Sequence, residues 1–222
     1  MFPVSDVIPS RTVPVVTIAL IVLNALVFLY EVTLGPTELR VFMASYAVVP
    51  TSFWWPSLVT SQFLHAGWMH IIWNMVYLWI FGDNVEDRLG HVGHLVFYLG
   101  AGAAAALLQV LFNPFSAIPM VGASGAIAAV MGAYFVLYPQ SRVLTAVFLL
   151  FFFDLVEIPA VVFLGFWFLM QLLSGVGSLG VRNAAAGGTA FWAHVGGFAV
   201  GAAVGFVLRR RGHSWHDDSY VA

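Results

Sequence analysis

Three groups of polar residues interrupt a chain that is otherwise strongly apolar. One group contains His65, His70 and Asn74, a second contains Ser124, and a third contains His194. A serine hydroxyl is a weak nucleophile until a neighbouring base takes its proton, and histidine is the side chain that most often does so. Polar and ionisable groups are costly in hydrocarbon, so inside a membrane they usually mark a site or a pathway. These residue types therefore indicate nucleophilic catalysis within a membrane.

The composition places the chain in a membrane. Of its 222 residues, 61% are hydrophobic and only 8% are charged, which is too little polar surface for a soluble globule. The net charge is −2 and the eight basic residues form no basic face, so nucleic acid is excluded as a partner. The chain has no cysteine, which excludes disulfides, thiolate catalysis and cysteine-bound metal.

The hydrophobic segments predict an all-α polytopic protein with six transmembrane helices. About 20 apolar residues are needed to cross about 30 Å of hydrocarbon. Segments near that length lie at 13–32, 64–81, 93–112, 124–138, 159–175 and 191–208. The first segment is longer than a signal-peptide core, so we expect it to remain as a helix. Residues 143–153 are also apolar, but as a helix they would span only about half of the hydrocarbon. We expect this part to be an interfacial stretch that leads into the fifth segment.

The expected organisation is a short cytoplasmic segment at 1–12, a membrane domain at 13–208 and a cytoplasmic tail at 209–222. Six spans place both termini on one side of the membrane. Most arginines fall on that side, as Arg11, Arg88, Arg142 and the cluster at 209–211, against Arg40 and Arg182 opposite. The positive-inside rule then predicts that both termini are cytoplasmic.

The same topology predicts that the three polar groups lie at one depth. The second, fourth and sixth segments all run inward from the outer face, and each carries its polar group within about its first three turns. We therefore expect a single site that opens toward the outer face of the membrane.

Small residues define one face on two of the segments. In the fourth segment Ser124 is followed by small residues at intervals of four, and in the sixth His194 is followed by Gly197 and Gly201. Such faces let two transmembrane helices approach closely. A stripe of this kind alone usually reflects plain packing, but these two faces carry a serine and a histidine. Close contact would place the Ser124 hydroxyl within hydrogen-bond reach of His194, which would act as the general base.

The residues around the serine suggest how a negatively charged intermediate would be stabilised. Ser124 is expected to begin its helix, and the free N–H groups of a helix N-terminus favour a developing oxyanion. His70 and Asn74 lie one turn apart on the second segment and both can donate a hydrogen bond. They are the candidates for the rest of an oxyanion hole. His65 lies nearer the loop, where we expect a structural bond to loop backbone.

The whole pattern resembles the motifs of the rhomboid intramembrane serine proteases. The residues that carry the resemblance are His65, His70 and Asn74; Gly122, Ser124 and Gly125; His194, Gly197 and Gly201; and a turn with Gly82, Glu86, Arg88 and Gly90. The likeness covers about residues 13 to 208. It implies a six-helix rhomboid bundle and a dyad of Ser124 and His194 with no acidic third member. It also implies an oxyanion site formed by His70, Asn74 and the Ser124 N–H.

Two positions depart from the family's pattern. Some members have a Trp-Arg pair in the first loop, where this chain offers Arg40 and separate tryptophans. Some members also place an aromatic residue four positions after the nucleophile, where it stacks on the base. This chain has Ala128 at that position, so the stacking support of His194 is not explained by the resemblance.

The resemblance implies an intramembrane serine endopeptidase that needs no cofactor or metal. Its expected partners are transmembrane protein substrates and membrane lipid, and its expected location is a prokaryotic cell membrane. In rhomboids the fifth helix is thought to flank the second where substrate enters from the lipid. The bulky residues of the fifth segment are Phe163, Phe166, Trp167 and Phe168. If they guard that entry, trimming Phe166 or Trp167 should raise turnover; if they face lipid or core, rates should not change.

Other functions fit the sequence less well. A metal-dependent protease could use His65, His70 and His194, but the chain lacks the His-Glu-x-x-His string of helical zinc proteases. An aspartyl protease would need Asp83 and Asp154, which lie toward the cytoplasmic side. An inactive rhomboid relative that binds and escorts membrane clients would typically lack the serine or the histidine. A transporter would show inverted repeats or paired broken helices, and the sequence shows neither.

Overall fold

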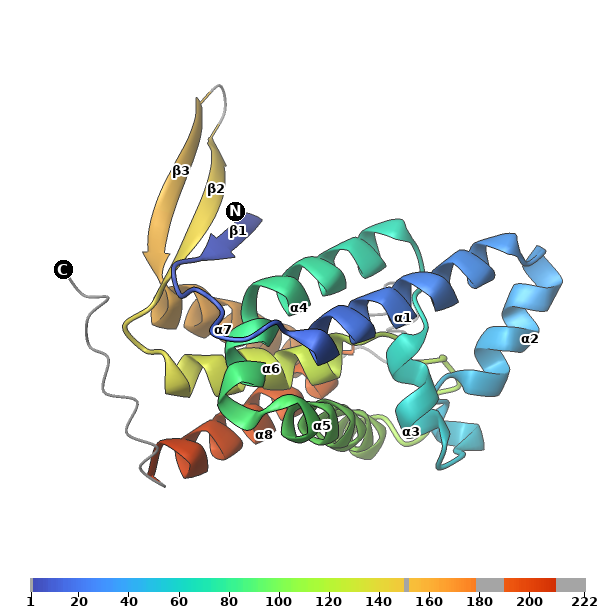
Figure 1. The fold of residues 1–222 in the computed structure, drawn as a ribbon. Helices are drawn as coiled ribbons and strands as arrows, with labels where there is room; N and C mark the ends of the chain where they lie inside the picture. The colour runs from blue at the N-terminus through green and yellow to red at the C-terminus, as the bar shows by residue number, and fades with distance from the viewer. Residues whose placement is uncertain (1, 150–151, 179–189, 211–222) are drawn as a thin grey trace.

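The computed structural model describes residues 2–149, 152–178 and 190–210, which form a helical bundle with a small sheet at one end (Figure 1). These residues are mostly helical, as predicted. The α-helices are α1 (Val15–Thr33), α2 (Pro36–Tyr46), α3 (Ser57–Thr60), α4 (Trp68–Leu89), α5 (His91–Phe112), α6 (Ser124–Leu137), α7 (Ala160–Ser178) and α8 (Phe191–Arg210). Two short 3-10 helices, Pro50–Ser52 and Ser61–Phe63, flank α3. The predicted tail beyond residue 210 lies outside the described residues.

Six of these helices coincide with the six hydrophobic segments predicted from the sequence. Of the described helices, α1, α5, α7 and α8 are long and apolar enough to cross a membrane. Helix α6 is apolar but has only 14 residues, a length of about 21 Å. Helix α4 has 22 residues but its last two turns are charged. Length and composition thus support four spans, and membrane crossing by α4 and α6 stays a prediction.

A three-stranded antiparallel sheet adds to the predicted helices. Its strands, in the order β1-β2-β3, are β1 (Phe2–Asp6), β2 (Arg142–Leu149) and β3 (Phe152–Pro159). Strand β1 pairs with β2, so that Phe2 lies opposite Ala146 and Asp6 opposite Val143. The described residues of the stretch expected to lie along the membrane interface, 143–149 and 152–153, are therefore in the paired strands β2 and β3. Their content of Val, Phe and Leu favours a strand, and the N-terminal segment pairs with the β2 edge that β3 leaves open.

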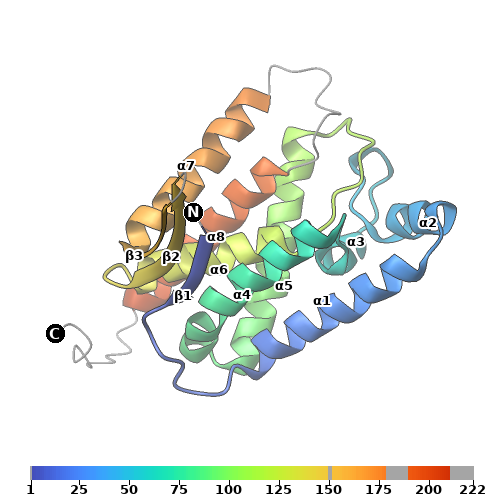
Figure 2. The ribbon, with the colours of Figure 1, turned by 90° about the horizontal axis from the view of Figure 1, so that it is seen from above.

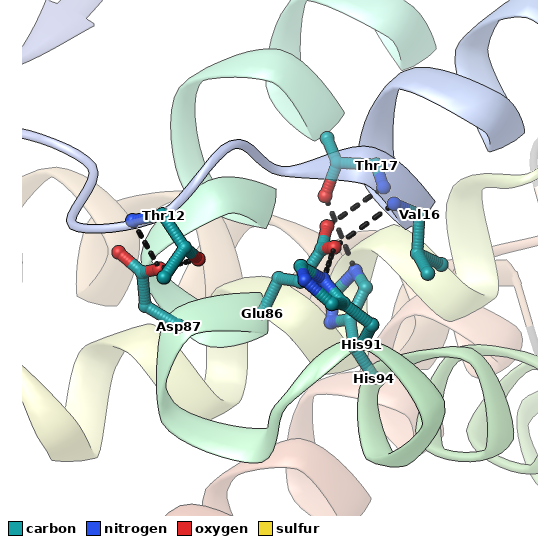
Figure 3. A network of polar contacts seen from close by, with 7 residues as sticks. All are labelled: Thr12, Val16, Thr17, Glu86, Asp87, His91 and His94. Atoms are coloured by element: carbon teal, nitrogen blue, oxygen red, sulfur yellow. Dashed lines mark hydrogen bonds and ion pairs between the residues drawn. The ribbon is translucent and has the colours of Figure 1, made fainter.

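Polar contacts at this sheet end join the start of α1 to the end of α4 (Figure 3). The Glu86 carboxylate accepts hydrogen bonds from the backbone N–H groups of Val16 (2.9 Å) and Thr17 (2.8 Å). It thereby caps a helix whose first N–H groups have no acceptor within the helix. An oxygen of the same carboxylate lies 2.6 Å from Nδ1 of His91. Glu86 is almost fully buried, and these hydrogen bonds offset the free-energy cost of burying its charge.

Helix α4 extends beyond the predicted end of the second segment because its last turns anchor the N-terminal chain. Asp87 accepts hydrogen bonds from the backbone N–H groups of Arg11 (2.7 Å) and Thr12 (3.0 Å). Gly90 then ends the helix with a φ of 71°, in the left-handed region that favours glycine. This turn lets α5 begin at once with His91.

Helices α6 and α8 pack against each other at the centre of the bundle, and Figure 2 shows α1 and α7 on opposite sides of this pair. A Cβ atom at Gly197 would overlap the carbonyl oxygen of Gly125, and one at Gly201 would overlap that of Ala129. Both helices advance by four residues between these contacts, so they run parallel and in register. This is the close approach predicted from the two faces of small residues.

Candidate active site

Ser124 and His194 lie in hydrogen-bond contact at the end of the bundle opposite the sheet. Ser124 is the first residue of α6, and His194 lies in the first turn of α8. Since the two helices are parallel and in register, residues near their starts meet at the same depth. The Oγ of Ser124 is 2.7 Å from Nε2 of His194. This is the distance at which a histidine can take the proton of a serine nucleophile.

The loop before α6 brings His70 next to the serine. Gly122 has a φ of 122°, a conformation that favours glycine, and its N–H donates to the carbonyl of Ser61 at 2.9 Å. A Cβ atom at Gly122 would lie 2.7 Å from the imidazole of His70. Only a residue without a side chain therefore lets α4 present His70 this close to the loop that leads into Ser124.

The hydrogen bonds of His70 make it a donor toward this loop. Its Nδ1 accepts the backbone N–H of Ala66 at 3.4 Å. A neutral imidazole that accepts at Nδ1 carries its proton on Nε2, and Nε2 is one of the two imidazole atoms closest to Gly122. The His70 side chain can therefore donate a hydrogen bond into the space beside Ser124.

Asn74 provides a second donor from the same face of α4. Its side chain is 7% exposed, and among the described residues its Nδ2 has no hydrogen-bond partner. The Nδ2 atom lies 3.7 Å from the Cβ position of Gly122. The N–H of Ser124 adds a third donor, because the first N–H groups of a helix have no acceptor within the helix. The arrangement can thus direct three hydrogen bonds to one developing negative charge.

A small pocket opens directly beside the serine. Its lining includes Ser61, Gln62, Met120, Ser124 and Ala193. The Oε1 of Gln62 is buried and has no partner among the described residues. Ser61 and Gln62 make part of this lining polar, and a polar cavity can hold water.

His65 occupies a buried position between α1 and α4. Its backbone N–H lies 3.3 Å from both carboxylate oxygens of Glu31. The ring packs against Phe28 and, with centroids 5.1 Å apart, against His70. The backbone of Phe63, in the loop before His65, interacts with the ring as expected, although in the described part of the chain neither ring nitrogen makes a hydrogen bond of ordinary geometry. His65 therefore supports the site by packing beside His70, and its backbone is held by a glutamate that sequence reasoning missed.

Two residues of α7 contact His194: Gln171, which the sequence analysis did not single out, and Trp167, which it considered only as a guard of substrate entry. The Oε1 of Gln171 lies 2.8 Å from Nδ1 of His194. The ring of Trp167 lies 5.7 Å from the imidazole, between centroids, at an interplanar angle of 39°. Ala128 of α6 has no ring to stack on His194, and Trp167 of α7 supplies one instead. The sequence feature that could have indicated this contact is a polar glutamine one helical turn after a tryptophan in an apolar segment.

The other bulky residues of α7 have separate surroundings. Phe163 stacks on Tyr77 of α4, with ring centroids 6.5 Å apart. Phe168 stacks on Phe198 of α8 at 4.7 Å. Phe166 is 62% exposed. Among these residues, Phe163 lies between α7 and α4, whereas Phe166 faces outward from the bundle.

The residues of the alternative enzymes are not gathered into sites. Among the residues that the structure describes, no three His, Asp or Glu side chains lie together as a group that could hold a metal ion. Asp83 accepts a hydrogen bond from the hydroxyl of Ser10 near the sheet, and Asp154 is an exposed residue of β3.

Comparisons with known proteins identify relatives over most of the chain. The Rhomboid domain matches residues 51–211, which is more than half of the chain. Rhomboid protease GluP of Bacillus subtilis (strain 168) is 29% identical over 197 residues, covering 86% of this chain and 35% of the relative. RHOMBOID-like protein 6, mitochondrial, of Arabidopsis thaliana is 32% identical over 152 residues, covering 68% and 43%. The chain therefore spans less than half the length of these relatives, whose names include both a protease and a rhomboid-like protein.

Proposed function

Because this chain belongs to the rhomboid family, we propose that it is an intramembrane serine endopeptidase that cleaves transmembrane protein substrates. The observation that carries the proposal is the 2.7 Å contact between Ser124 Oγ and His194 Nε2. Family membership alone does not carry it, since the relatives include rhomboid-like proteins as well as proteases. A serine and a base in contact, beside converging hydrogen-bond donors, are the groups that acyl transfer requires.

In the first half of the reaction the Ser124 oxygen attacks the carbonyl carbon of the scissile peptide bond. Its proton passes to Nε2 of His194, and the carbonyl oxygen becomes an oxyanion. The donors from His70, Asn74 and the Ser124 N–H stabilise that charge. The carbon–nitrogen bond then breaks as His194 gives the proton to the leaving amine, which leaves an ester on Ser124.

In the second half water hydrolyses the ester. His194 takes a proton from a water molecule as the water oxygen attacks the ester carbon, and the same donors hold the second oxyanion. The bond to Ser124 then breaks, and His194 returns the proton to the serine oxygen. The polar pocket beside Ser124 is a route by which this water could arrive. No step requires a cofactor.

We also propose the orientation in the membrane. Arg11, beside Asp87 at the end of α4, and Arg142, at the start of β2, lie at the sheet end of the bundle. An excess of arginine marks the cytoplasmic side of a membrane protein. The proposed orientation therefore has cytoplasmic termini and a site that opens toward the outer face. The membrane proposed for it is the cell membrane of a prokaryote, which the arginine distribution does not test.

The proposal is tested by incubating the purified protein in detergent with a transmembrane protein substrate. The wild-type protein should cleave it, and Ser124→Ala and His194→Ala should each remove nearly all cleavage. The double variant should be little worse than either, because the two residues act as a unit. Chelators should have no effect, and loss of activity that zinc restores would favour a metal enzyme. Substrate that is bound but never cleaved by folded wild-type protein would favour the client-binding function.

A further inference from the structure

Helix α7 contacts the imidazole of His194 on two sides. Gln171 meets its edge, with Oε1 2.8 Å from Nδ1, and Trp167 lies against its ring. The two residues are one turn apart, so they project from one face of α7. Both are half-buried. The serine occupies the opposite edge of the same imidazole, at Nε2.

The contact with Gln171 selects one of the two neutral forms of the imidazole. A neutral histidine carries its proton on one nitrogen and accepts a hydrogen bond at the other. An amide oxygen can only accept, so this hydrogen bond forms when the proton is on Nδ1 and is donated to Gln171. The lone pair then lies on Nε2, facing the hydroxyl of Ser124. With the opposite tautomer, Nε2 would carry the proton and could not accept the proton of the serine.

We propose that Gln171 is a positioning residue that holds His194 in the tautomer and orientation required of the base. This inference rests on the proposed protease function. In soluble serine proteases a buried aspartate does this work at the same nitrogen. A neutral amide gives the same geometry without a second charge in an apolar bundle, where an unpaired carboxylate would be costly. The site thus contains a third member, supplied by a helix other than α6 and α8.

Two replacements of similar length separate hydrogen bonding from packing. Gln171→Met keeps the volume but removes the acceptor, whereas Gln171→Glu keeps an oxygen that can accept from Nδ1. Ser174→Ala, on the same helix and outside the site, is the matched control. In a soluble triad the change of aspartate to asparagine leaves the histidine in the wrong tautomer and lowers kcat by about 10⁴-fold; here it is the amide oxygen that faces Nδ1. We expect a smaller loss, about 10- to 100-fold, for Gln171→Met, because no charge is removed with the acceptor.

The experiment measures kcat and KM for all three variants, together with thermal unfolding. Gln171→Met should lose kcat with KM nearly unchanged, while Gln171→Glu and Ser174→Ala should stay within about threefold of wild type. Wild-type kcat in Gln171→Met would overturn the assignment, and so would equal losses in folded Met and Glu variants. An inactive wild-type protein would instead contradict the proposed function, so the two failures are distinguishable.

A spectroscopic measurement on the unaltered site tests the same proposal even if Gln171→Met does not fold. The ¹⁵N signals of labelled histidine side chains distinguish the two tautomers, and a His194→Ala sample identifies which signals belong to His194. We expect the protonated nitrogen of wild-type His194 to be Nδ1. Protonation at Nε2 in the neutral ring would contradict the proposal.

Discussion

Asn74 and His70 differ in how fully their hydrogen-bonding groups are used. Nδ1 of His70 already accepts a backbone N–H, which leaves the other nitrogen to donate into the site. The Nδ2 of Asn74 is buried without a partner in the described chain. A buried, unused donor costs roughly 1–3 kcal/mol of folding free energy. Such a cost is understandable if the donor binds the oxyanion that forms during catalysis.

Removing the hydrogen-bond donors of His70 and Asn74 one at a time and then together should lower kcat in steps. In soluble serine proteases a lost oxyanion donor costs on the order of 10²–10³ in kcat. We expect less from Asn74→Ala or His70→Ala, because two donors remain and water in the site can replace a side chain. The double variant should approach the inactivity of Ser124→Ala. Steady-state kinetics check this, and near wild-type kcat in a folded double variant would show that these residues only pack the helix.

Trp167 and Phe166 should respond differently to substitution. The sequence leaves two expectations open: trimming either residue raises turnover if it guards substrate entry, and leaves the rate unchanged if it faces lipid or core. However, Trp167 lies against His194, and aromatic contacts of this kind contribute about 0.5–1.5 kcal/mol. Trp167→Ala should therefore lower kcat by up to about tenfold, whereas Phe166→Ala should not lower it. Equal rates for the two variants and wild type would show that the ring of Trp167 does not support the base.

At the scale of secondary structure elements, glycines determine how closely α6 and α8 approach. A Cβ atom at Gly201 would overlap backbone atoms of Ala129, and backbone cannot move aside as a side chain can. The approach of these two helices sets the distance between Ser124 and His194. Stability and activity should therefore fall together when this interface is widened.

A pair of glycine substitutions tests this interface. Gly201→Ala should lower the free energy of unfolding by about 1–3 kcal/mol or more through overpacking, and it should reduce cleavage. Gly100→Ala on α5 is the control, since a Cβ atom there meets nothing within 4 Å. It should be neutral or stabilise by up to about 1 kcal/mol. Thermal unfolding in detergent measures both, and equal stability of the two variants would refute the packing argument.

Strand β1 should dock on the bundle in a pH-dependent manner. Burial raises the pKa of Asp6 to about 6, an effect increased by the nearby Asp83 carboxylate and opposed by the hydrogen bond from Tyr134. The docked strand therefore binds a proton more tightly than the free strand. Docking should be strongest below about pH 4 and should weaken as the pH rises through about 6.

Hydrogen exchange of β1, corrected for the intrinsic pH dependence, measures this effect. Protection of the strand should decrease between about pH 4 and pH 6 in the wild-type protein. Asp6→Asn should be nearly insensitive to pH over this range, because an amide can accept the Tyr134 hydrogen bond without titrating. The same pH dependence in both proteins would show that Asp6 is not the titrating group.

At the scale of the whole molecule, the sequence predicted the parts that follow from periodicity and polarity. The positions of the six apolar helices, the start of α6 at Ser124 and the meeting of its small-residue face with that of α8 all agree with the structure. These features depend on local hydrophobic length and on residues spaced by four, which a sequence displays directly.

The missed features depend on contacts between distant parts of the chain. The sheet forms because 2–6 and 142–149 pair across more than a hundred residues, and no local pattern specifies that pairing. The role of Gln171 arises because α7 lies beside α8, which spacing within one helix cannot show. The extension of α4 beyond the predicted segment likewise depends on a distant contact, because its charged last turns accept hydrogen bonds from the start of α1.

The central claim is that His194 activates Ser124 as a nucleophile. The most direct measurement is the intact mass of the protein after incubation with a fluorophosphonate, an electrophile that reacts preferentially with activated serines. Wild-type protein should gain one adduct, located on Ser124 by peptide mapping, and folded Ser124→Ala and His194→Ala should gain none. An adduct on another residue, or labelling of Ser124 at the wild-type rate in folded His194→Ala, would contradict the account.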